Sequence, residues 1–143
     1  MAMEHSVVLD ASPLVALIDR DDAHHYWAVE EFSRIDGSLI TCETVIAEAY
    51  YLVRRNPAGI STLLSYLDEG IVRLDFDLGL NLASVTALMR KYRDVPMSLA
   101  DACLVRMSEL HDRARVFTLD SDFKRYRRHG RQAIPLIIPG PTR

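Results

Sequence analysis

The stretch Ser6-Val7-Val8-Leu9-Asp10-Ala11-Ser12-Pro13 decides the expected fold of this 143-residue chain. Its first four residues form a short apolar, β-branched run, which is typical of a buried strand. Ser12 followed by Pro13 is typical of a helix start, because serine caps the first turn and proline suits the first helical position. A buried strand that leads directly into a helix predicts the beginning of an α/β fold.

The rest of the chain continues to alternate between the two kinds of element. Short apolar runs predict strands, and apolar residues at helical spacing predict helices. The expected strands are 39–42, 71–74, 115–119 and 133–138, and the expected helices are 14–19, 23–35, 44–55, 60–67, 78–92, 98–111 and a short basic helix at 123–129. This alternation predicts a mostly parallel central sheet in a three-layer α/β/α sandwich.

Length and composition indicate one soluble domain over residues 1–143. A chain of this size can bury a substantial core, and 49% hydrophobic with 26% charged residues is ordinary globular composition. Met1 to His5 carries no basic stretch leading into an apolar run, and no segment approaches the ~20 apolar residues that span a bilayer. We therefore expect a cytoplasmic protein without membrane contact. Cys42 and Cys103 lie in apolar patterns, where we expect reduced thiols.

The formal net charge of −3 hides an uneven distribution. Residues 1–89 contain 14 acids and 5 Lys or Arg, whereas residues 90–143 contain 6 acids and 12 Lys or Arg. Such a mildly acidic protein is not typical of a general nucleic-acid coat. A basic C-terminal part folded beside an acidic cluster can still hold one phosphate backbone locally, and the alternative is an ordinary solvated surface.

Acidic residues follow two of the expected strands, at the edge where parallel sheets bind ligands. Asp10 comes directly after the first strand, and with Ser12 as the helix cap its carboxylate is left without a capping role. The alternative is an Asp that binds the amides of the next turn. Asp120 follows the strand 115–119 and Asp122 comes two residues later, so that one of them caps the next helix and the other is free for chemistry.

Two further acids lie near the starts of expected helices, Glu48 one turn into the helix 44–55 and Asp101 in the first turn of the helix 98–111. Glu48 stands among apolar neighbours, where an unpaired buried acid is costly, although it can equally face solvent. Asp101 follows Ser98 by three residues, which is capping-box spacing, and a helix N-terminus favours its charge by about 0.3–1 kcal/mol and predicts a low pKa. Clustered carboxylates repel one another unless a cation is present. Carboxylate and water ligands suit Mg²⁺ or Mn²⁺, and no Cys/His spacing suits structural zinc.

Taken in order, these motifs resemble the PIN-domain family, especially the VapC-type toxins of toxin–antitoxin pairs. The resemblance covers nearly the whole chain. Its pieces are Val8-Leu9-Asp10-Ala11-Ser12, Glu48, Ser98-Leu99-Ala100-Asp101-Ala102 and Thr118-Leu119-Asp120-Ser121-Asp122-Phe123. It implies a dimeric, Mg²⁺- or Mn²⁺-dependent endoribonuclease. Its site residues would be Asp10 and Asp101 as principal metal ligands, Glu48 and Asp120 as the remaining acids, Ser12 and Thr118 as orienting hydroxyls, and Asp122 as a substitute for Asp120.

The resemblance also implies a substrate and partners. RNA would be hydrolysed to 5′-phosphate and 3′-hydroxyl ends, and basic side chains would hold its phosphates without reading its sequence. The candidates for these contacts are Lys124, Arg125, Arg127, Arg128 and Arg131. Segments 23–35 and 50–67 offer more apolar residues than one sheet face requires. We therefore expect a homodimer, or a complex with a cognate antitoxin whose basic segment approaches the acids.

Three other functions fit parts of the pattern. A haloacid-dehalogenase-like phosphatase also begins with an aspartate after strand one, but its chemistry requires a second acid where this chain has Ser12. A response-regulator receiver requires an acidic pair after strand one. A non-catalytic PIN scaffold that only binds partners would have no need of four acids.

Overall fold

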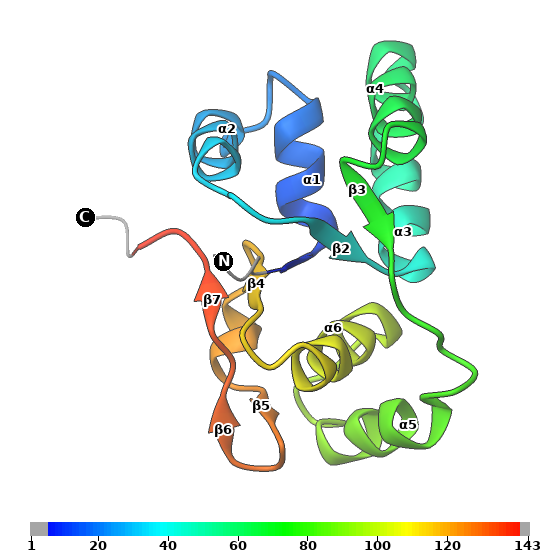
Figure 1. The fold of residues 1–143 in the computed structure, drawn as a ribbon, viewed down its shortest axis with the longest axis vertical. Helices are drawn as coiled ribbons and strands as arrows, with labels where there is room; N and C mark the ends of the chain where they lie inside the picture. Colours follow the sequence, from blue (N-terminus) through cyan, green and yellow to red (C-terminus); the bar gives the residue numbers. More distant parts are fainter. Residues whose placement is uncertain (1–5, 141–143) are drawn as a thin grey trace.

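The structure is a computed structural model that describes residues 6–140 and has a five-stranded parallel sheet with helices around it (Figure 1). The strands of this sheet are β1 (Val7–Leu9), β2 (Leu39–Thr41), β3 (Val72–Leu74), β4 (Arg115–Phe117) and β7 (Leu136–Ile137). The helices are α1 (Ala11–Ile18), α2 (His25–Ser33), α3 (Glu43–Val53), α4 (Pro57–Asp68), α5 (Leu82–Lys91) and α6 (Leu99–Leu110). A 3₁₀ helix, η1 (Ser121–Lys124), precedes a hairpin of β5 (Arg127–Arg128) and β6 (Gln132–Ala133).

The order of the strands is β3-β2-β1-β4-β7, so β1 lies at the centre of the sheet. The chain adds β2 and β3 on one side of β1 and then returns to add β4 and β7 on the other. Leu9 at the end of β1 is level with Phe117 at the end of β4. Where the strand order reverses in this way, a crevice opens beyond the carboxyl ends of the two central strands, and ligands bind there.

Both faces of the central part of the sheet are covered, which explains why β1 and β2 are buried throughout, whereas the edge strand β3 exposes Arg73 and Leu74. All three residues of β1 are buried. In Figure 1, α1 and α2 lie on one side of the sheet and α5 and α6 on the other. Helix α6 carries an almost continuous buried stretch from Ala100 to Ser108, because it packs between the sheet and α5. The expected three-layer α/β/α sandwich with a parallel sheet is confirmed.

Three helix boundaries differ from the sequence-based expectation. Helix α1 begins at Ala11 because Asp10, and not Ser12, is its N-cap; the Asp10 carboxylate accepts a hydrogen bond from the Ala11 amide. Asn56 caps α4, which begins at Pro57 and not at residue 60 as expected. Helix α5 begins only at Leu82, because residues 78–81 form a turn held by the Asp77 carboxylate.

The expected basic helix at 123–129 is wrong. Only the short η1 helix forms, and the chain then enters β5 and turns back at His129 and Gly130, which both have positive φ angles of 51° and 81°. The expected strand 133–138 is divided into β6 and β7 around Pro135, which has no N–H to donate to a sheet ladder.

The expectations about targeting, membrane spans and cysteines can be compared with the structure only over residues 6–140. The stretch Met1 to His5, in which we expect no targeting signal, lies outside the described residues. Within residues 6–140, none of the helices is both long and apolar enough to cross a bilayer. Cys42 and Cys103 are buried free thiols, as expected.

Candidate functional site

Asp10 lies at the carboxyl end of β1, in the crevice that the strand order creates. It is only 6% exposed. Its Oδ1 accepts a hydrogen bond from the Ala11 amide at 2.7 Å, and its Oδ2 accepts one from the Thr118 hydroxyl at 2.7 Å. Thr118 comes directly after β4 and is fully buried. The two central strands therefore hold this carboxylate in one orientation.

The segment after β4 brings Asp120 beside the same crevice. Thr118 Oγ1 accepts from the Asp120 amide at 3.0 Å, and Ser12 Oγ accepts from the Leu119 amide at 3.4 Å. Asp120 caps η1, because its Oδ1 accepts from the Asp122 amide at 2.9 Å. Its Oδ2 receives no hydrogen bond from residues 6–140. Asp122 instead approaches Arg125, at 3.9 Å, which favours Asp120 as the fourth acid.

Asp101 occupies the first turn of α6 in a complete capping box. Its amide donates to Ser98 Oγ at 3.0 Å, and its Oδ2 accepts from the Ser98 amide at 3.2 Å. The same oxygen accepts from the Tyr126 hydroxyl at 3.1 Å. The other carboxylate oxygen, Oδ1, receives no hydrogen bond within the described part of the chain.

Glu48 reaches the site from α3. The sequence left open whether this side chain is buried or faces solvent, and in the structure it is exposed. It forms no hydrogen bond or ion pair with residues 6–140. Partial burial of its carboxylate raises its pKa, and the charges of Asp101 and Asp120 add to this rise. Glu48 therefore lies near Asp101 and Asp120 without a hydrogen-bond partner among residues 6–140.

The charges of these acids act on one another in several pairs, which indicates that they lie near the same crevice. Burial raises the pKa of Asp10 to about 6; the charges of Asp101 and Glu48 add to the rise, and the hydrogen bonds from Thr118 and Ala11 oppose it. Burial also raises the pKa of Asp101, outweighing its bonds to Ser98 and Tyr126, and the charge of Asp120 adds to it. The low pKa expected for Asp101 at a helix N-terminus is therefore wrong, because the loss of surrounding water has the larger effect.

The site fits a hydrated divalent cation better than a tightly enclosed one. No three His, Cys, Asp or Glu side chains within residues 6–140 are arranged closely enough to hold a metal ion as they stand. None of the four acids has an ion pair with Lys or Arg in that range. Mg²⁺ keeps several waters and needs only one or two direct carboxylates. A cation would also relieve the repulsion that adds to the effect of burial on the pKa values of Asp10, Glu48 and Asp101.

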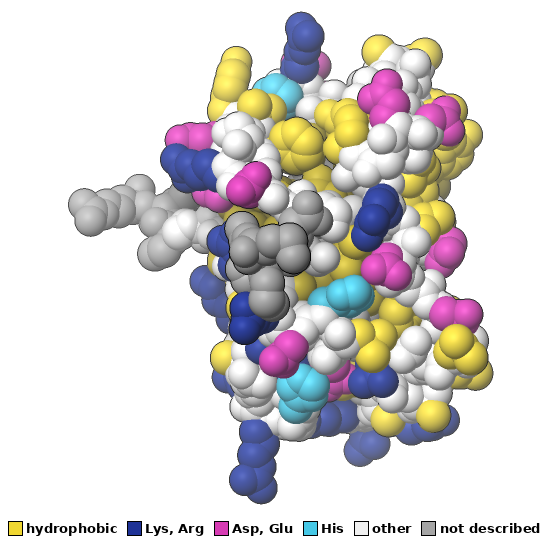
Figure 2. Space-filling view, viewed as in Figure 1, with side chains coloured by type: hydrophobic (Ala, Val, Ile, Leu, Met, Phe, Trp, Pro, Cys, Tyr) yellow, Lys and Arg dark blue, Asp and Glu magenta, His cyan; other side chains and the backbone are white. Residues whose placement is uncertain are grey.

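The basic side chains proposed to bind phosphate have different roles in the structure. Arg128 is 4% exposed, and its guanidinium donates to the carbonyl oxygens of Ser108 at 3.0 Å and Asp112 at 2.7 Å. It secures the end of α6 and is not available to RNA, so its expected phosphate contact is wrong. Lys124, Arg125 and Arg131 are exposed, and Figure 2 shows Lys and Arg side chains gathered at the lower end of the molecule, over α5 and the β5–β6 hairpin.

Tyr126 contacts the site although the sequence did not single it out. A buried tyrosine requires a hydrogen-bond partner, and this is the only sequence signal for its role. The partner could not be identified, because Asp101 is 25 residues away and residue 126 was expected inside a helix.

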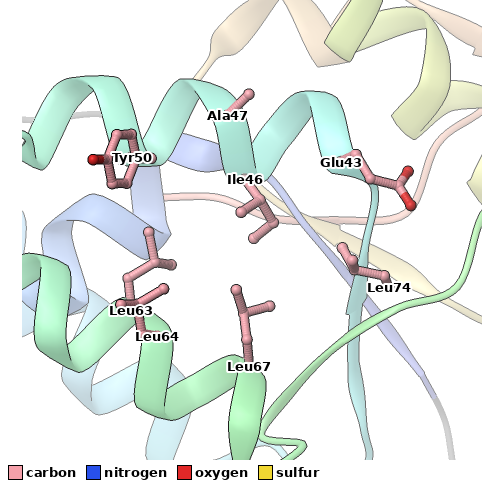
Figure 3. A pocket seen from close by; sticks show the side chains of 8 residues that line it. All are labelled: Glu43, Ile46, Ala47, Tyr50, Leu63, Leu64, Leu67 and Leu74. Carbon is pink, nitrogen blue, oxygen red and sulfur yellow. The ribbon is translucent and has the colours of Figure 1, made fainter.

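An apolar groove lies between α3 and α4 and is closed at one end by β3 (Figure 3). Its volume is about 370 Å³. Tyr50 and Leu64 in its wall are half-exposed. The lining residues are Glu43, Ile46, Ala47, Tyr50, Leu63, Leu64, Leu67 and Leu74. Glu43 is the one charged member of this lining.

A parallel α/β/α sandwich with acids after β1 and β4 and at the start of α6 is the arrangement that the PIN-domain resemblance implies. The family model of the PIN domain matches residues 7–129, and the chain belongs to this family. No curated protein matches the chain at a significant level.

Among solved structures, the fold is similar to that of VapC20 from Mycobacterium tuberculosis, described as a toxin that cleaves the sarcin–ricin loop. The TM-score is 0.71, with 17% sequence identity over 81% of this chain and 91% of that chain. At this identity the likeness shows the shared fold.

Proposed function

We propose that this protein is a divalent-metal-dependent endoribonuclease that hydrolyses RNA phosphodiester bonds. The proposal is supported by the positions of Asp10 and Asp120 directly after β1 and β4 and of Asp101 in the first turn of α6, and by Glu48 of α3, whose pKa is raised in part by the charges of Asp101 and Asp120. These acids come from four segments far apart in the sequence. Membership of the PIN-domain family and the fold shared with an RNA-cleaving toxin support the same function.

The four acids have different positions and, we infer, different roles. Asp10 and Asp101 are fixed by hydrogen bonds and are suited to hold Mg²⁺ or Mn²⁺, and Asp120 offers its unbonded Oδ2. When bound, the cation supplies positive charge against the phosphate and makes nearby water more acidic. Glu48 is exposed, unbonded and has a raised pKa, so its carboxylate is suited to accept a proton from the attacking water.

Phosphate contacts outside the acidic site would come from exposed basic side chains. Lys124 and Arg125 follow Asp120 within a few residues, and Arg131 lies at the tip of the β5–β6 hairpin. Arg127 is partly occupied, because its guanidinium donates to the carbonyl oxygens of Lys124 and Tyr126. Such contacts position a nucleic acid without selecting its sequence.

RNA cleavage with and without metal tests the proposed function. An end-labelled single-stranded RNA should be cut by the purified protein in Mg²⁺ or Mn²⁺, should remain intact in EDTA, and should be cut again when excess metal is restored. The products should carry 5′-phosphate and 3′-hydroxyl ends. Cleavage that persists in EDTA, or that leaves 2′,3′-cyclic phosphate, would reject a hydrolytic metal mechanism.

We also propose that the protein is the toxin of a toxin–antitoxin pair and that the antitoxin occupies the α3–α4 groove (Figure 3). The groove wall is almost entirely apolar, with Glu43 at one end, so it fits an apolar segment that carries a basic residue. Helix α3 also carries Glu48, but Glu48 does not line the groove, so a bound segment would reach the acids only by continuing around this helix. Co-expression with the product of a neighbouring gene tests this: the two chains should co-purify. A homodimer that buries the groove would replace the antitoxin proposal.

A further inference from the structure

The Tyr126 hydroxyl is held by a rigid aromatic cluster and points at Asp101. Tyr126 is fully buried, and its ring makes edge contacts with Phe123 and Tyr92, with ring centres 5.2 and 5.1 Å apart. Its hydroxyl lies 3.1 Å from Oδ2 of Asp101. Burial and the neighbouring carboxylates raise the pKa of Tyr126, so the hydroxyl keeps its proton and acts as the donor.

This bond makes the two oxygens of Asp101 different. Oδ2 accepts from two donors on separate elements, the Ser98 amide at 3.2 Å and the Tyr126 hydroxyl at 3.1 Å. Oδ1 receives no hydrogen bond within residues 6–140. A capping box alone leaves the carboxylate free to rotate about one contact, whereas a second donor from another direction fixes its plane.

The end of α5 bonds to the hairpin that follows Tyr126 and not to the Tyr126 hydroxyl. The Tyr92 hydroxyl accepts from the Arg127 amide at 2.9 Å, and Lys91 Nζ donates to the Gly130 carbonyl at 3.0 Å. These contacts hold the start of the β5–β6 hairpin, directly after Tyr126. Tyr92 therefore packs against the ring of Tyr126 but does not itself form a hydrogen bond to any of the four acids.

We propose that Tyr126 is a positioning residue of the acidic site, which holds Oδ2 of Asp101 so that Oδ1 is offered to a divalent cation. The proposal rests on the proposed function, because it requires Asp101 to be a metal ligand. Thr118 fixes Asp10 in the same manner, by a hydroxyl bond to one carboxylate oxygen. Hydroxyls from the C-terminal part of the chain thus orient both principal acids.

Mn²⁺ binding by three proteins tests this role: the wild type, Y126F and the matched control Y92F. Y126F keeps the ring and its stacking but removes the donor, so its Kd for Mn²⁺, measured by titration calorimetry, should rise about 10- to 100-fold. Y92F removes a hydroxyl from the same aromatic cluster, and its Kd should stay within about twofold of the wild type. RNA cleavage by Y126F should recover as Mn²⁺ is raised, so that the metal concentration for half-maximal rate changes more than kcat.

The outcomes separate this proposal from the proposed function. If the wild type binds Mn²⁺ and Y126F binds it equally well, or if Y126F and Y92F weaken binding equally, the positioning role is wrong. If the wild type neither binds Mn²⁺ nor cleaves RNA, the proposed function itself fails. A second measurement needs no metal: Y126F should lower the melting temperature less in a D101A background than in the wild type, because the partner is gone. Equal effects in both backgrounds would overturn the proposal.

Discussion

The hydroxyl of Thr118 donates a 2.7 Å hydrogen bond to Oδ2 of Asp10, from a position 108 residues later in the chain. The bond joins the ends of β4 and β1 and is possible only because these strands are neighbours in the sheet. It lowers the pKa of a carboxyl group that burial otherwise raises. The fold therefore places an ionisable group in its interior and orients it with a neutral donor.

Removing this donor should impair the site. T118V keeps the shape of the side chain but leaves Oδ2 of Asp10 and the Asp120 amide without their partner, so unfolding free energy should fall by about 1–3 kcal/mol. RNA cleavage should fall about 10- to 100-fold. T118S restores the hydroxyl and is the control. Equal activity of T118V and T118S would show that the bond does not orient Asp10.

The metal-free protein should lose stability as the pH rises. Burial raises the pKa of Asp10 from 3.8 to about 6, so the folded protein holds this proton more tightly than the unfolded chain. The free energy of unfolding should therefore fall as the pH rises from about 4 to about 6. The total loss is about 3 kcal/mol. With EDTA present, raising the pH from 5 to 7.5 should therefore lower the melting temperature of D10N less than that of the wild type. Parallel losses in both proteins would contradict the burial of an ionised Asp10.

Arg128 should matter for stability and not for RNA binding. R128M removes the donors to the Ser108 and Asp112 carbonyl oxygens, and it should lower unfolding free energy by about 2–4 kcal/mol. The matched variant K124Q/R125Q should leave the melting temperature unchanged. It should weaken RNA binding and reduce the salt slope of log K by about 1.4, if each side chain contacts one phosphate. Weaker RNA binding by folded R128M would contradict a purely structural role for Arg128.

Groove residues should control assembly. L64K places a charge in the apolar wall between α3 and α4, at a residue that is 51% exposed and not part of the core. The variant should fold and cleave RNA like the wild type but should not bind the antitoxin. Light scattering at micromolar concentration would check for a homodimer in both proteins. An L64K protein that binds the antitoxin as tightly as the wild type would exclude this groove.

The sequence predicted the layers well because burial on both faces leaves a continuous apolar pattern in the strands. Val7 to Leu9 and the buried face of α6 are examples. Asp10 and Asp120 could be located at the sheet edge because each follows a strand, and Asp101 because it begins a helix, whereas Glu48 lies in the middle of α3 and only the fold determines which way it faces. The choice of Ser12 as the cap of α1 was wrong: both residue types cap well, and it is the Asp10 carboxylate that accepts from the Ala11 amide.

Residues 121–137 were predicted least accurately. Their basic and apolar residues fit a helix by spacing, but the outcome depends on contacts made far away in sequence. Tyr92 and Lys91 form hydrogen bonds from the end of α5 to the hairpin, and Arg128 is buried with its guanidinium bonded to a carbonyl oxygen near the end of α6. These are tertiary interactions that no local pattern records. The role of Tyr126 was missed for the same reason.

Single-turnover cleavage of one RNA by three asparagine variants tests the central claim most directly. D101N and D120N should lower the rate at saturating Mg²⁺ by at least about 100-fold while melting at or above the wild-type temperature, because each removes a charge from the proposed metal site. D122N is the matched control, since Asp122 faces Arg125 and should be dispensable for the reaction. Wild-type rates in D101N and D120N would contradict a catalytic carboxylate site at this edge of the sheet.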